Sequence, residues 1–278
     1  MDRKSLKMIK NSKIWIVTDV DGTLMDHSYD LTPAKDTIKR LQKLKIPVIL
    51  CTSKTASEVK VIQKDLGLYD PYIVENGGAI YSDSNIEGTW EMILGESYQK
   101  LGQILKELSN DINFQLKPLN DLSDKEANSL TGLSGNSLNL MRDRHWSMPF
   151  LNPPEHLEED LKKFCDKYEV VIFRGNRMSH LLSKNSSKGE AIKKLKEFSI
   201  NSKLKIIGLG DSPNDLPLLK EADHRIVISG INGPNEKLLD DLNDLDYVIS
   251  EEAHGVGWQK EVNKILGNLI NDYNQFPL

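Results

Sequence analysis

The sequence contains few cysteines and no long apolar run. Two cysteines among 278 residues cannot form the disulfide framework of a secreted scaffold, and no Cys/His zinc spacing is present. No uncharged apolar run of roughly 18 residues occurs, so we expect no membrane span. The lysines near the N-terminus are followed only by Ile14 to Val17 before Thr18, too short a run for a signal peptide. These absences predict a cytoplasmic protein without a membrane partner.

An excess of positive charge is also missing. Lys and Arg number 36 and Asp and Glu number 41, which gives a net charge of −5. Nucleic-acid phosphates are held by clustered cations, so no nucleic-acid partner is expected. Apolar residues make up 38% of the 278 residues, which suits one large or two moderate domains with ordinary cores. We expect a small-molecule partner, and the sequence does not indicate an oligomeric state.

Short apolar segments alternate with amphipathic ones at both ends of the sequence. Residues 14–17, 47–51 and 72–74 have the length of strands, whereas a segment from Thr32 onward and residues 56–66 have helical spacing. The alternation returns later, with helices predicted at 188–198, 216–222 and 257–270 and strands at 205–209, 225–228 and 247–249. Such alternation indicates βαβ units. We therefore predict an α/β fold with a Rossmann-like parallel sheet covered on both faces.

The segment between these halves has a different composition. From residue 83 to 183 continuous apolar strands are fewer, residues 128–139 are rich in Ser and Asn, and prolines stand at 149, 153 and 154. We expect a second domain at 83–183, inserted into a core of 1–82 and 184–278 through linkers at 77–83 and 183–187.

Polar residues follow four of the predicted strands. Asp19 and Asp21 follow the first, Thr52 the second, Glu75 the third, and Asp211 a strand far along the chain. In an open parallel sheet, ligands bind beyond the carboxyl ends of the strands. Carboxylates gathered there would repel one another unless a cation neutralised them, and oxygen ligands suit Mg²⁺. The sequence thus predicts a Mg²⁺ site at this edge of the sheet.

These residues carry a family resemblance. Asp19-Val20-Asp21-Gly22-Thr23, then Thr52, Lys188 and the segment 210–215 resemble, in this order, the four signature motifs of the haloacid dehalogenase superfamily of phosphotransferases. The resemblance spans nearly the whole chain. The long insert resembles the α+β cap of a subgroup that includes sugar-phosphate phosphatases, which implies a Rossmann-like core with an inserted α+β cap domain that selects the substrate.

The resemblance implies roles for the acids. Asp19 is expected to be the nucleophile that forms an aspartyl phosphate, and Asp21 to protonate the leaving oxygen and then deprotonate the attacking water. The Asp19 carboxylate, the Asp21 backbone carbonyl and the Asp211 carboxylate are expected to bind Mg²⁺. Two neighbouring acids at a buried strand end have few stabilising uses without a cation, which supports this interpretation.

Further residues have supporting roles in the same scheme. Thr52 is expected to donate its hydroxyl to a phosphate oxygen, and Lys188 to contribute positive charge to the phosphate and to Asp19. Asp215, with Asn214 beside it, is expected to orient Lys188 or a metal-bound water. Taken alone, a Thr at a strand end is most often a cap, and a Lys at a helix start is usually solvated. Their functional interpretation depends on the two Asp motifs.

A narrower resemblance covers residues 49–55, 74–80, 173–177 and 208–215. These segments resemble the mannosyl-3-phosphoglycerate phosphatase family, which has Ser-Lys, here Ser53-Lys54, where many sugar phosphatases of the superfamily carry Gly-Arg. The implied reaction removes phosphate from a hexosyl-3-phosphoglycerate and yields hexosylglycerate, a compatible solute. Family members commonly have Glu where this chain has Met148, so the sugar contacts there are expected to differ, and glucose stands beside mannose as the hexose.

Cations of the insert are candidates for binding the carboxylate of such a substrate, because the guanidinium fork of Arg can hold both oxygens. They gather in two short stretches: Arg142, Arg144, Arg174, Arg177 and His180. Arg174 and Arg177 are favoured because they match the family's Arg-Gly-x-Arg pattern, and pairing with surface acids is an equal alternative for each cation. The predicted substrate-binding set is Lys54, Arg142, Arg174, Arg177 and His180.

Two other functions stay open at this point. One is a broader sugar-phosphate phosphatase or phosphomutase of the same superfamily. The other, of a different class, is a catalytically silent ligand-binding module that retains the fold. The presence of the complete set of motif residues argues against the silent module, because such a descendant has no physical reason to keep Asp19, Asp21, Thr52, Lys188 and Asp211.

Overall fold

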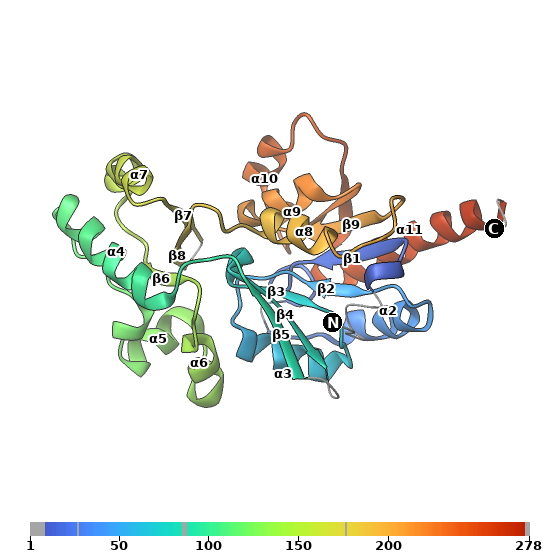
Figure 1. Cartoon of the computed structure of the whole chain (residues 1–278), viewed down its shortest axis with the longest axis horizontal. Coiled ribbons are helices and arrows are strands. Elements are labelled where there is room, and N and C mark those ends of the chain that lie inside the picture. The colour runs from blue at the N-terminus through green and yellow to red at the C-terminus, as the bar shows by residue number, and fades with distance from the viewer. Residues whose placement is uncertain (1–8, 27, 85–87, 176, 276–278) are drawn as a thin grey trace.

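The computed structural model describes residues 9–26, 28–84, 88–175 and 177–275. The largest sheet is parallel, with the strand order β11-β10-β9-β1-β2 (Figure 1). Its strands are β1 (Ile14–Thr18), β2 (Val48–Leu50), β9 (Lys205–Gly210), β10 (His224–Ser229) and β11 (Val248–Ala253). The prediction of an α/β fold with a parallel sheet is confirmed, because strands from both ends of the sequence join one sheet.

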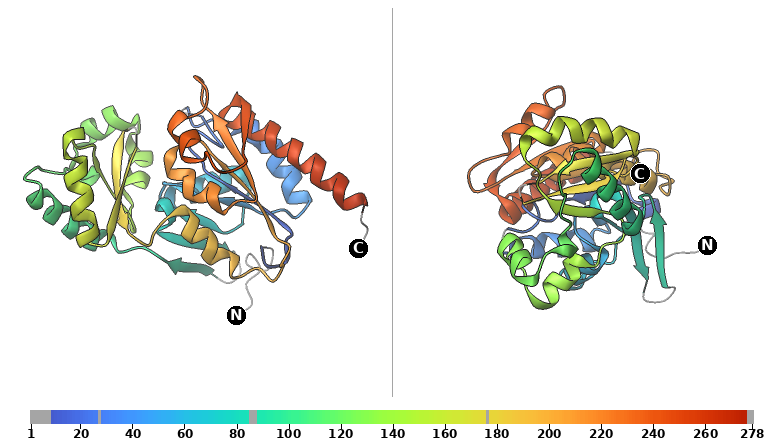
Figure 2. Two further views of the ribbon diagram at one scale, coloured as in Figure 1. Left: turned by 90° about the horizontal axis from the view of Figure 1, so that it is seen from above. Right: turned by 90° about the vertical axis from the view of Figure 1, so that its left-hand side faces the viewer.

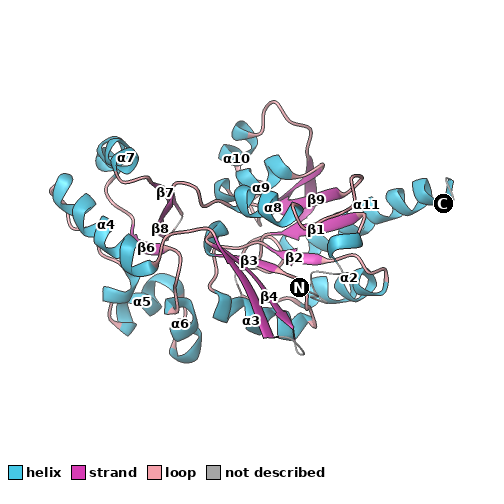
Figure 3. Cartoon of the chain, viewed as in Figure 1, coloured by secondary structure: helices cyan, strands magenta, loops and turns pink. Residues whose placement is uncertain are grey.

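Helices cover both faces of this sheet (Figure 3). On one face lie α2 (Thr32–Lys43), α3 (Ala56–Leu66) and α11 (His254–Gln275), and on the other α8 (Lys188–Lys196), α9 (Leu216–Glu221) and α10 (Glu236–Asp241). Ile38 and Trp258 belong to the apolar cluster on the first face, and Leu195 and Leu218 to that on the second. β1 and β2 are buried along their whole length and consist of nearly continuous apolar runs.

The third predicted strand, residues 72–74, is present but does not belong to the parallel sheet as expected. β3 (Tyr72–Val74) pairs antiparallel with β4 (Ala79–Ser84), which pairs with β5 (Gly88–Ile93). Among the described residues, an isolated parallel bridge between Cys51 and Ile73 joins this group to the parallel sheet. The predicted domain boundary after residue 82 falls inside β4, and we propose that the inserted domain begins only where the hairpin ends, at Ile93.

The inserted segment forms a separate layer of sheet and helices (Figure 2). Its antiparallel sheet has the order β6-β8-β7, with β6 (Met148–Leu151), β7 (Val170–Arg174) and β8 (Met178–Ser183). Its helices are α4 (Tyr98–Asp111), α5 (Asp124–Thr131), α6 (Gly135–Arg142) and α7 (Glu158–Lys167). α4 and α7 pack on the sheet through a cluster that includes Leu105, Phe150 and Leu161. The expected α+β character of the insert is therefore present.

Short 3-10 turns connect several of these elements. They are η1 (Glu75–Gly77), η2 (Leu119–Asp121), η3 (Glu155–Leu157) and η4 (Pro213–Asp215). Within the described ranges, no helix is both long and apolar enough to cross a membrane.

The two connections between core and insert lie against each other. Gly77 has a φ of +96°, and a Cβ at this position would lie 2.1 Å from the Ser187 carbonyl oxygen. Only glycine fits both the backbone conformation and this close approach. Beyond β5, a Cβ at Gly95 would lie 3.0 Å from Ser186 Oγ and 3.3 Å from Gly78 Cα, so the chain leaves and re-enters the core beside this same turn.

Candidate active site

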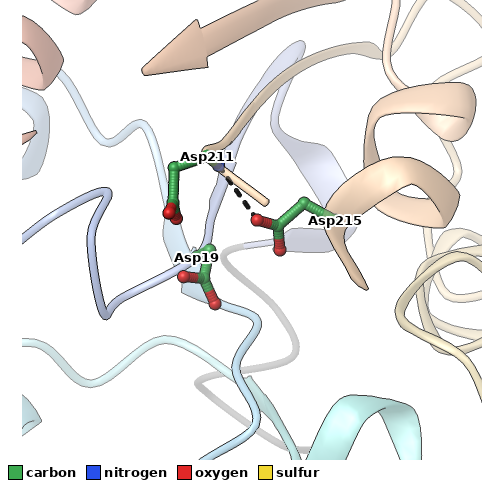
Figure 4. Close-up of side chains that lie close together, drawn as sticks. All are labelled: Asp19, Asp211 and Asp215. Atoms are coloured by element: carbon green, nitrogen blue, oxygen red, sulfur yellow. Dashed lines mark hydrogen bonds between the residues drawn. The ribbon is translucent and has the colours of Figure 1, made fainter. Parts of the chain in front are cut away.

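Two acids meet at the carboxyl ends of adjacent strands. Asp19 follows β1, and its backbone amide donates to the Leu209 carbonyl of β9 at 2.9 Å. Asp211 follows β9. Asp19, Asp211 and Asp215 each offer a carboxylate oxygen within 4.8 Å of the others (Figure 4). The strand exits that the sequence placed far apart are therefore brought within reach of one ion.

Asp215 is bonded both to the loop after β9 and to Lys188. Its Oδ2 accepts hydrogen bonds from the backbone amides of Asp211 at 2.9 Å and Ser212 at 3.0 Å. Its Oδ1 lies 2.5 Å from Lys188 Nζ. Because both oxygens are engaged, Asp19 and Asp211 are the two carboxylates of the cluster best able to hold a metal. The expected role of Asp215 in orienting Lys188 would act through this direct contact.

The loop after β1 holds Asp211 in place. The Thr23 hydroxyl donates to Asp211 Oδ1 at 2.7 Å. Gly22 has a φ of +83°, and a Cβ there would lie 2.5 Å from Asp211 Oδ2. Glycine at position 22 therefore leaves the space that the second Asp211 oxygen occupies.

Burial makes the cluster electrostatically costly. Desolvation raises the pKa of Asp19 to about 7, although Lys188 opposes the shift. Desolvation and the neighbouring Asp215 and Asp19 raise the pKa of Asp211 well above its usual range. Burial alone would lower the pKa of Lys188, but the Asp19 and Asp215 carboxylates raise it above its ordinary value. A hard divalent cation would relieve the repulsion between the acids, and their oxygen ligands suit Mg²⁺.

The Asp21 carboxylate pairs with Lys54 and is not one of the acidic cluster. Its Oδ1 lies 3.0 Å from Lys54 Nζ, and its side chain is 41% exposed. Lys54 is buried and also approaches Glu58 Oε1 at 3.5 Å. Both Asp21 and Lys54 line a cavity between the core and the insert. A group held in this cavity would thus meet both Asp21 and Lys54.

Thr52 leaves the strand next to that of Asp19. The amide of Cys51 donates to the Thr18 carbonyl at 2.8 Å, which fixes the two strand exits side by side. Thr52 is fully buried, and its hydroxyl oxygen accepts from the Lys54 amide at 3.2 Å. The hydroxyl hydrogen is thereby left to donate elsewhere.

Asn214 connects two polar strand exits. Its side-chain amide nitrogen donates to Asn76 Oδ1 at 3.3 Å, and its carbonyl oxygen accepts from the Ser212 hydroxyl. Asn76 itself is buried, has a φ of +58°, and donates its backbone amide to the Thr52 carbonyl at 2.9 Å. Asn214 therefore contacts η1, the turn whose Asn76 is bonded to the Thr52 carbonyl.

The cavity beside Asp21 and Asp211 has a volume of about 250 Å³. Core residues on its wall include Tyr29, Ser53 and Ser212, and residues of the insert include Arg144, Arg177 and His180. A second cavity of about 500 Å³ shares Ser53, Ser212 and His180 with it. The two together form a cleft between core and insert next to the acids.

The predicted cations of the insert divide into two groups. Arg142 Nη1 lies 2.5 Å from Asp124 and its Nη2 donates to the Leu122 carbonyl at 2.7 Å, so this side chain is engaged within the insert. Arg174 pairs with Glu158 and lines only the larger cavities.

Arg177 and His180 do line the 250 Å³ cavity. Arg177 also donates to the Thr131 carbonyl at 3.1 Å. Arg144, which the sequence analysis names among the candidate cations but leaves out of the predicted substrate-binding set, lines the same cavity.

Met148 does not face the cleft. Its side chain is 3% exposed and packs with Leu101 and Phe150 in the core of the insert. The expected effect of this position on sugar contacts therefore has no direct contact to support it.

Comparisons with known proteins agree with the geometry. A family model described as haloacid dehalogenase-like hydrolase matches residues 16–232. A glucosyl-3-phosphoglycerate/mannosyl-3-phosphoglycerate phosphatase of Persephonella marina is 34% identical over 269 residues, with 91% of this chain and 97% of the relative covered.

Solved structures share the fold. A haloacid dehalogenase-like hydrolase from Bacteroides thetaiotaomicron is 18% identical with a TM-score of 0.66, covering 91% of this chain and 100% of the other. The sucrose-phosphatase of Synechocystis, in complex with sucrose and phosphate, is 17% identical with a TM-score of 0.62, covering 91% and 97%. With its motifs in order and a family model matched over most of its length, this chain belongs to the haloacid dehalogenase-like hydrolases.

Proposed function

We propose that the protein is a Mg²⁺-dependent phosphatase that hydrolyses the phosphate monoester of glucosyl- or mannosyl-3-phosphoglycerate to the hexosylglycerate. The observation that carries the proposal is the cluster of Asp19, Asp211 and Lys188, which adjoins, through Asp211, a cavity that is also lined by cations. The relative from Persephonella marina, whose name states both substrates, supports the substrate class.

Asp19 is the proposed nucleophile. Its carboxylate oxygen forms a bond to phosphorus while the bond from phosphorus to the glycerate oxygen breaks. Asp21 gives its proton to that departing oxygen, and the hexosylglycerate leaves. Asp21 then takes a proton from water as the water oxygen attacks phosphorus, which releases inorganic phosphate and restores Asp19.

Asp19 and Asp211, with the backbone carbonyl of Asp21, would hold Mg²⁺, whose charge would reduce the repulsion between the phosphate and Asp19. Lys188 lies 2.6 Å from Asp19 Oδ1 and is fully buried, so its charge acts in a water-poor site. The Thr52 hydroxyl is proposed to donate to a phosphate oxygen, since its own oxygen already accepts from a backbone amide.

The inserted domain, from the end of β5 to residue 183, is proposed to act as the cap that selects the substrate. Lys54, Arg177 and His180 line the cavity next to Asp21, where the leaving group would lie. We further propose that Arg142 and Arg174 have structural roles, because both are paired with acids of the insert. The small, charged substrate and product suit a cytoplasmic enzyme of compatible-solute synthesis.

The test is phosphate release from glucosyl- and mannosyl-3-phosphoglycerate, with and without Mg²⁺, by wild type and Asp19→Asn. We expect release that requires Mg²⁺ and falls by ~10³-fold or more in the variant. A panel of phosphosugars separates the broader phosphatase or phosphomutase, which would turn over neutral sugar phosphates equally well. Tight ligand binding without release from any substrate would favour the silent binding module.

A further inference from the structure

Arg144 is a nearly buried cation with one unused nitrogen. Its side chain lies between core and insert and is 8% exposed. Its Nε donates to the Met141 carbonyl at 3.1 Å, and its Nη1 donates to the Ser53 carbonyl at 2.9 Å and to the Ser147 hydroxyl oxygen at 3.1 Å. Within the described part of the chain, Nη2 makes no hydrogen bond. Arg144 also lines the 250 Å³ cavity.

A buried glutamate fixes this arginine through a relay. The Ser147 hydroxyl donates to Glu75 Oε2 at 2.6 Å while it accepts from Arg144. The Glu75 carboxylate also accepts from the backbone amides of His145 at 3.0 Å and Trp146 at 3.1 Å. Glu75 is 1% exposed and has a φ of +50°, an uncommon conformation for a residue other than glycine. The core residue Glu75 therefore holds the loop that carries Arg144.

The acids on the cavity wall do not neutralise Arg144. Asp21 and Glu58 are both within ion-pair distance of Lys54, at 3.0 Å and 3.5 Å. Asp211 belongs to the acidic cluster and accepts from Thr23. Glu75 reaches Arg144 only through the Ser147 hydroxyl, and within the described part of the chain no carboxylate lies within ion-pair distance of the guanidinium. A planar carboxylate from a ligand would match its fork. The cavity wall therefore presents a positive charge with which a bound anion can pair.

A second polar group on the same wall lacks a partner. His180 lines the cavity, and its Nδ1 is a buried nitrogen without a hydrogen-bond partner among the described residues. Burial, with a smaller contribution from Arg144, lowers the pKa of His180 to about 3. A neutral imidazole beside Arg144 suits an oxygen-rich ligand, because it can exchange a hydrogen bond without adding charge.

We propose that Arg144, positioned by Ser147 and Glu75, binds the glycerate carboxylate of the substrate and determines the specificity for an acidic leaving group. This inference rests on the proposed function. Arg144 is hydrogen-bonded to the carbonyl of Ser53. Since Ser53 follows Thr52, the proposed phosphate-binding residue, Arg144 would bind the carboxylate at a fixed position relative to the phosphate.

The test compares two substrates in Arg144→Gln. One is glucosyl-3-phosphoglycerate, and the other is p-nitrophenyl phosphate, which has no carboxylate. We expect the ratio of their kcat/KM values to fall by ~10²-fold, mostly through KM for the first substrate, since a charge-assisted hydrogen-bonded pair is lost. Arg144→Lys should lose less, and free glycerate should inhibit wild type competitively and Arg144→Gln weakly.

The positioning role of Glu75 has its own readout. Glu75→Gln should lower the same ratio less than Arg144→Gln, and the double variant should show no additional loss, because both act on one contact. Arg40→Gln, which removes an exposed arginine of α2 bonded to Asn263, is the control and should leave the ratio unchanged.

An equal loss on both substrates in Arg144→Gln and Arg144→Lys, or no loss on either, would overturn the assignment. A wild-type enzyme that hydrolyses p-nitrophenyl phosphate but not hexosyl-3-phosphoglycerates would instead refute the proposed function. The two failures are thus distinguishable.

Discussion

Lys188 Nζ lies 2.6 Å from Asp19 Oδ1, although 169 positions separate the two residues in the sequence. The same nitrogen lies 2.5 Å from Asp215 Oδ1, and the Lys188 and Asp215 side chains are fully buried. One cation therefore compensates two carboxylates at the carboxyl ends of the strands. Because Lys188 begins α8, the second half of the core is joined to the first half through this ion pair.

Removal of this cation should affect stability as well as catalysis. In Lys188→Met, two buried carboxylates lose their partner, which should lower the free energy of unfolding by about 3–5 kcal/mol. Phosphatase activity should fall by ~10²-fold or more, because the charge beside the nucleophile is gone. Urea unfolding and phosphate release measure the two effects.

The matched control is Lys193→Met on the same helix. Lys193 pairs with Glu190 at 2.6 Å but its side chain is 51% exposed, so we expect a change in stability within about 0.5 kcal/mol. If Lys188→Met unfolded at the same urea concentration as Lys193→Met, the buried pair would not be a stabilising element.

Mg²⁺ should stabilise the folded protein through the acidic cluster. At a concentration 100-fold above its Kd, a ligand that binds only the folded state adds about 2.7 kcal/mol. We expect a rise in Tm with Mg²⁺ for wild type and little rise for Asp211→Asn, which lacks one carboxylate of the cluster. Differential scanning calorimetry with and without chelator measures the shift.

Without metal, Asp211→Asn should not lose stability relative to wild type. Burial raises the pKa of Asp211 well above its usual range, which means that its ionised form is disfavoured in the folded protein. Asp211→Asn keeps an oxygen to accept from Thr23 and removes this charge, so it should be at least as stable as wild type in chelator. An equal Tm rise with Mg²⁺ in both proteins would exclude the cluster as the metal site.

Much of the core could be predicted from the sequence, because its signals are local. The helix predicted at 56–66 matches α3, whose ends are set by a capping box of Thr55 and Glu58 and by Gly67 in the left-handed conformation. The strand at 72–74 has the predicted bounds but not the predicted pairing. Its pairing depends on the hairpin that follows, which apolar runs alone do not reveal.

The cleft was harder to predict than the acids. Asp19 and Asp211 follow apolar strands, and the edge where parallel strands end is known in advance. Arg142 ends α6 and Arg144 lies two positions beyond it, yet the first is bonded within the insert and the second lines the cavity. Only the placement of Glu75 and Ser147 across the interface decides between them.

Gly22 should be intolerant of a side chain for a reason specific to the site. In Gly22→Ala the new Cβ would lie 2.5 Å from Asp211 Oδ2, and the φ of +83° adds strain. We expect a loss of stability of about 1–3 kcal/mol together with a raised Mg²⁺ requirement for phosphate release.

Gly67→Ala is the control that separates backbone strain from the close contact with Asp211. Gly67 has a φ of +65°, but a Cβ there would meet only Gln42 Nε2, at 3.9 Å. This control should lose about 1 kcal/mol of stability through backbone strain alone and keep the wild-type dependence on Mg²⁺. The same Mg²⁺ dependence in both variants would show that Gly22 does not serve the Asp211 position.

Asp70 lies at the edge of the sheet opposite the acids, where β2 begins. It should make the stability of the protein depend on pH. It is 3% exposed; its Oδ2 accepts from the Val48 amide at 2.9 Å, and its Oδ1 has no partner among the described residues. Burial raises its pKa to about 7 from 3.8. The folded state then binds more protons than the unfolded state between these values, so the contribution of Asp70 to stability falls as pH rises from about 4 to 7.

Asp70→Asn isolates this contribution from that of Asp19 and Asp211, which both proteins retain. The amide oxygen of Asn can still accept from Val48, and no charge has to be buried. We expect the variant to exceed wild type by about 1–3 kcal/mol at pH 8, with the difference shrinking toward pH 5. Urea unfolding at several pH values measures it. Parallel stability curves would mean that Asp70 has an ordinary pKa, and a variant less stable at pH 8 would mean that its ionised form is favoured by the fold.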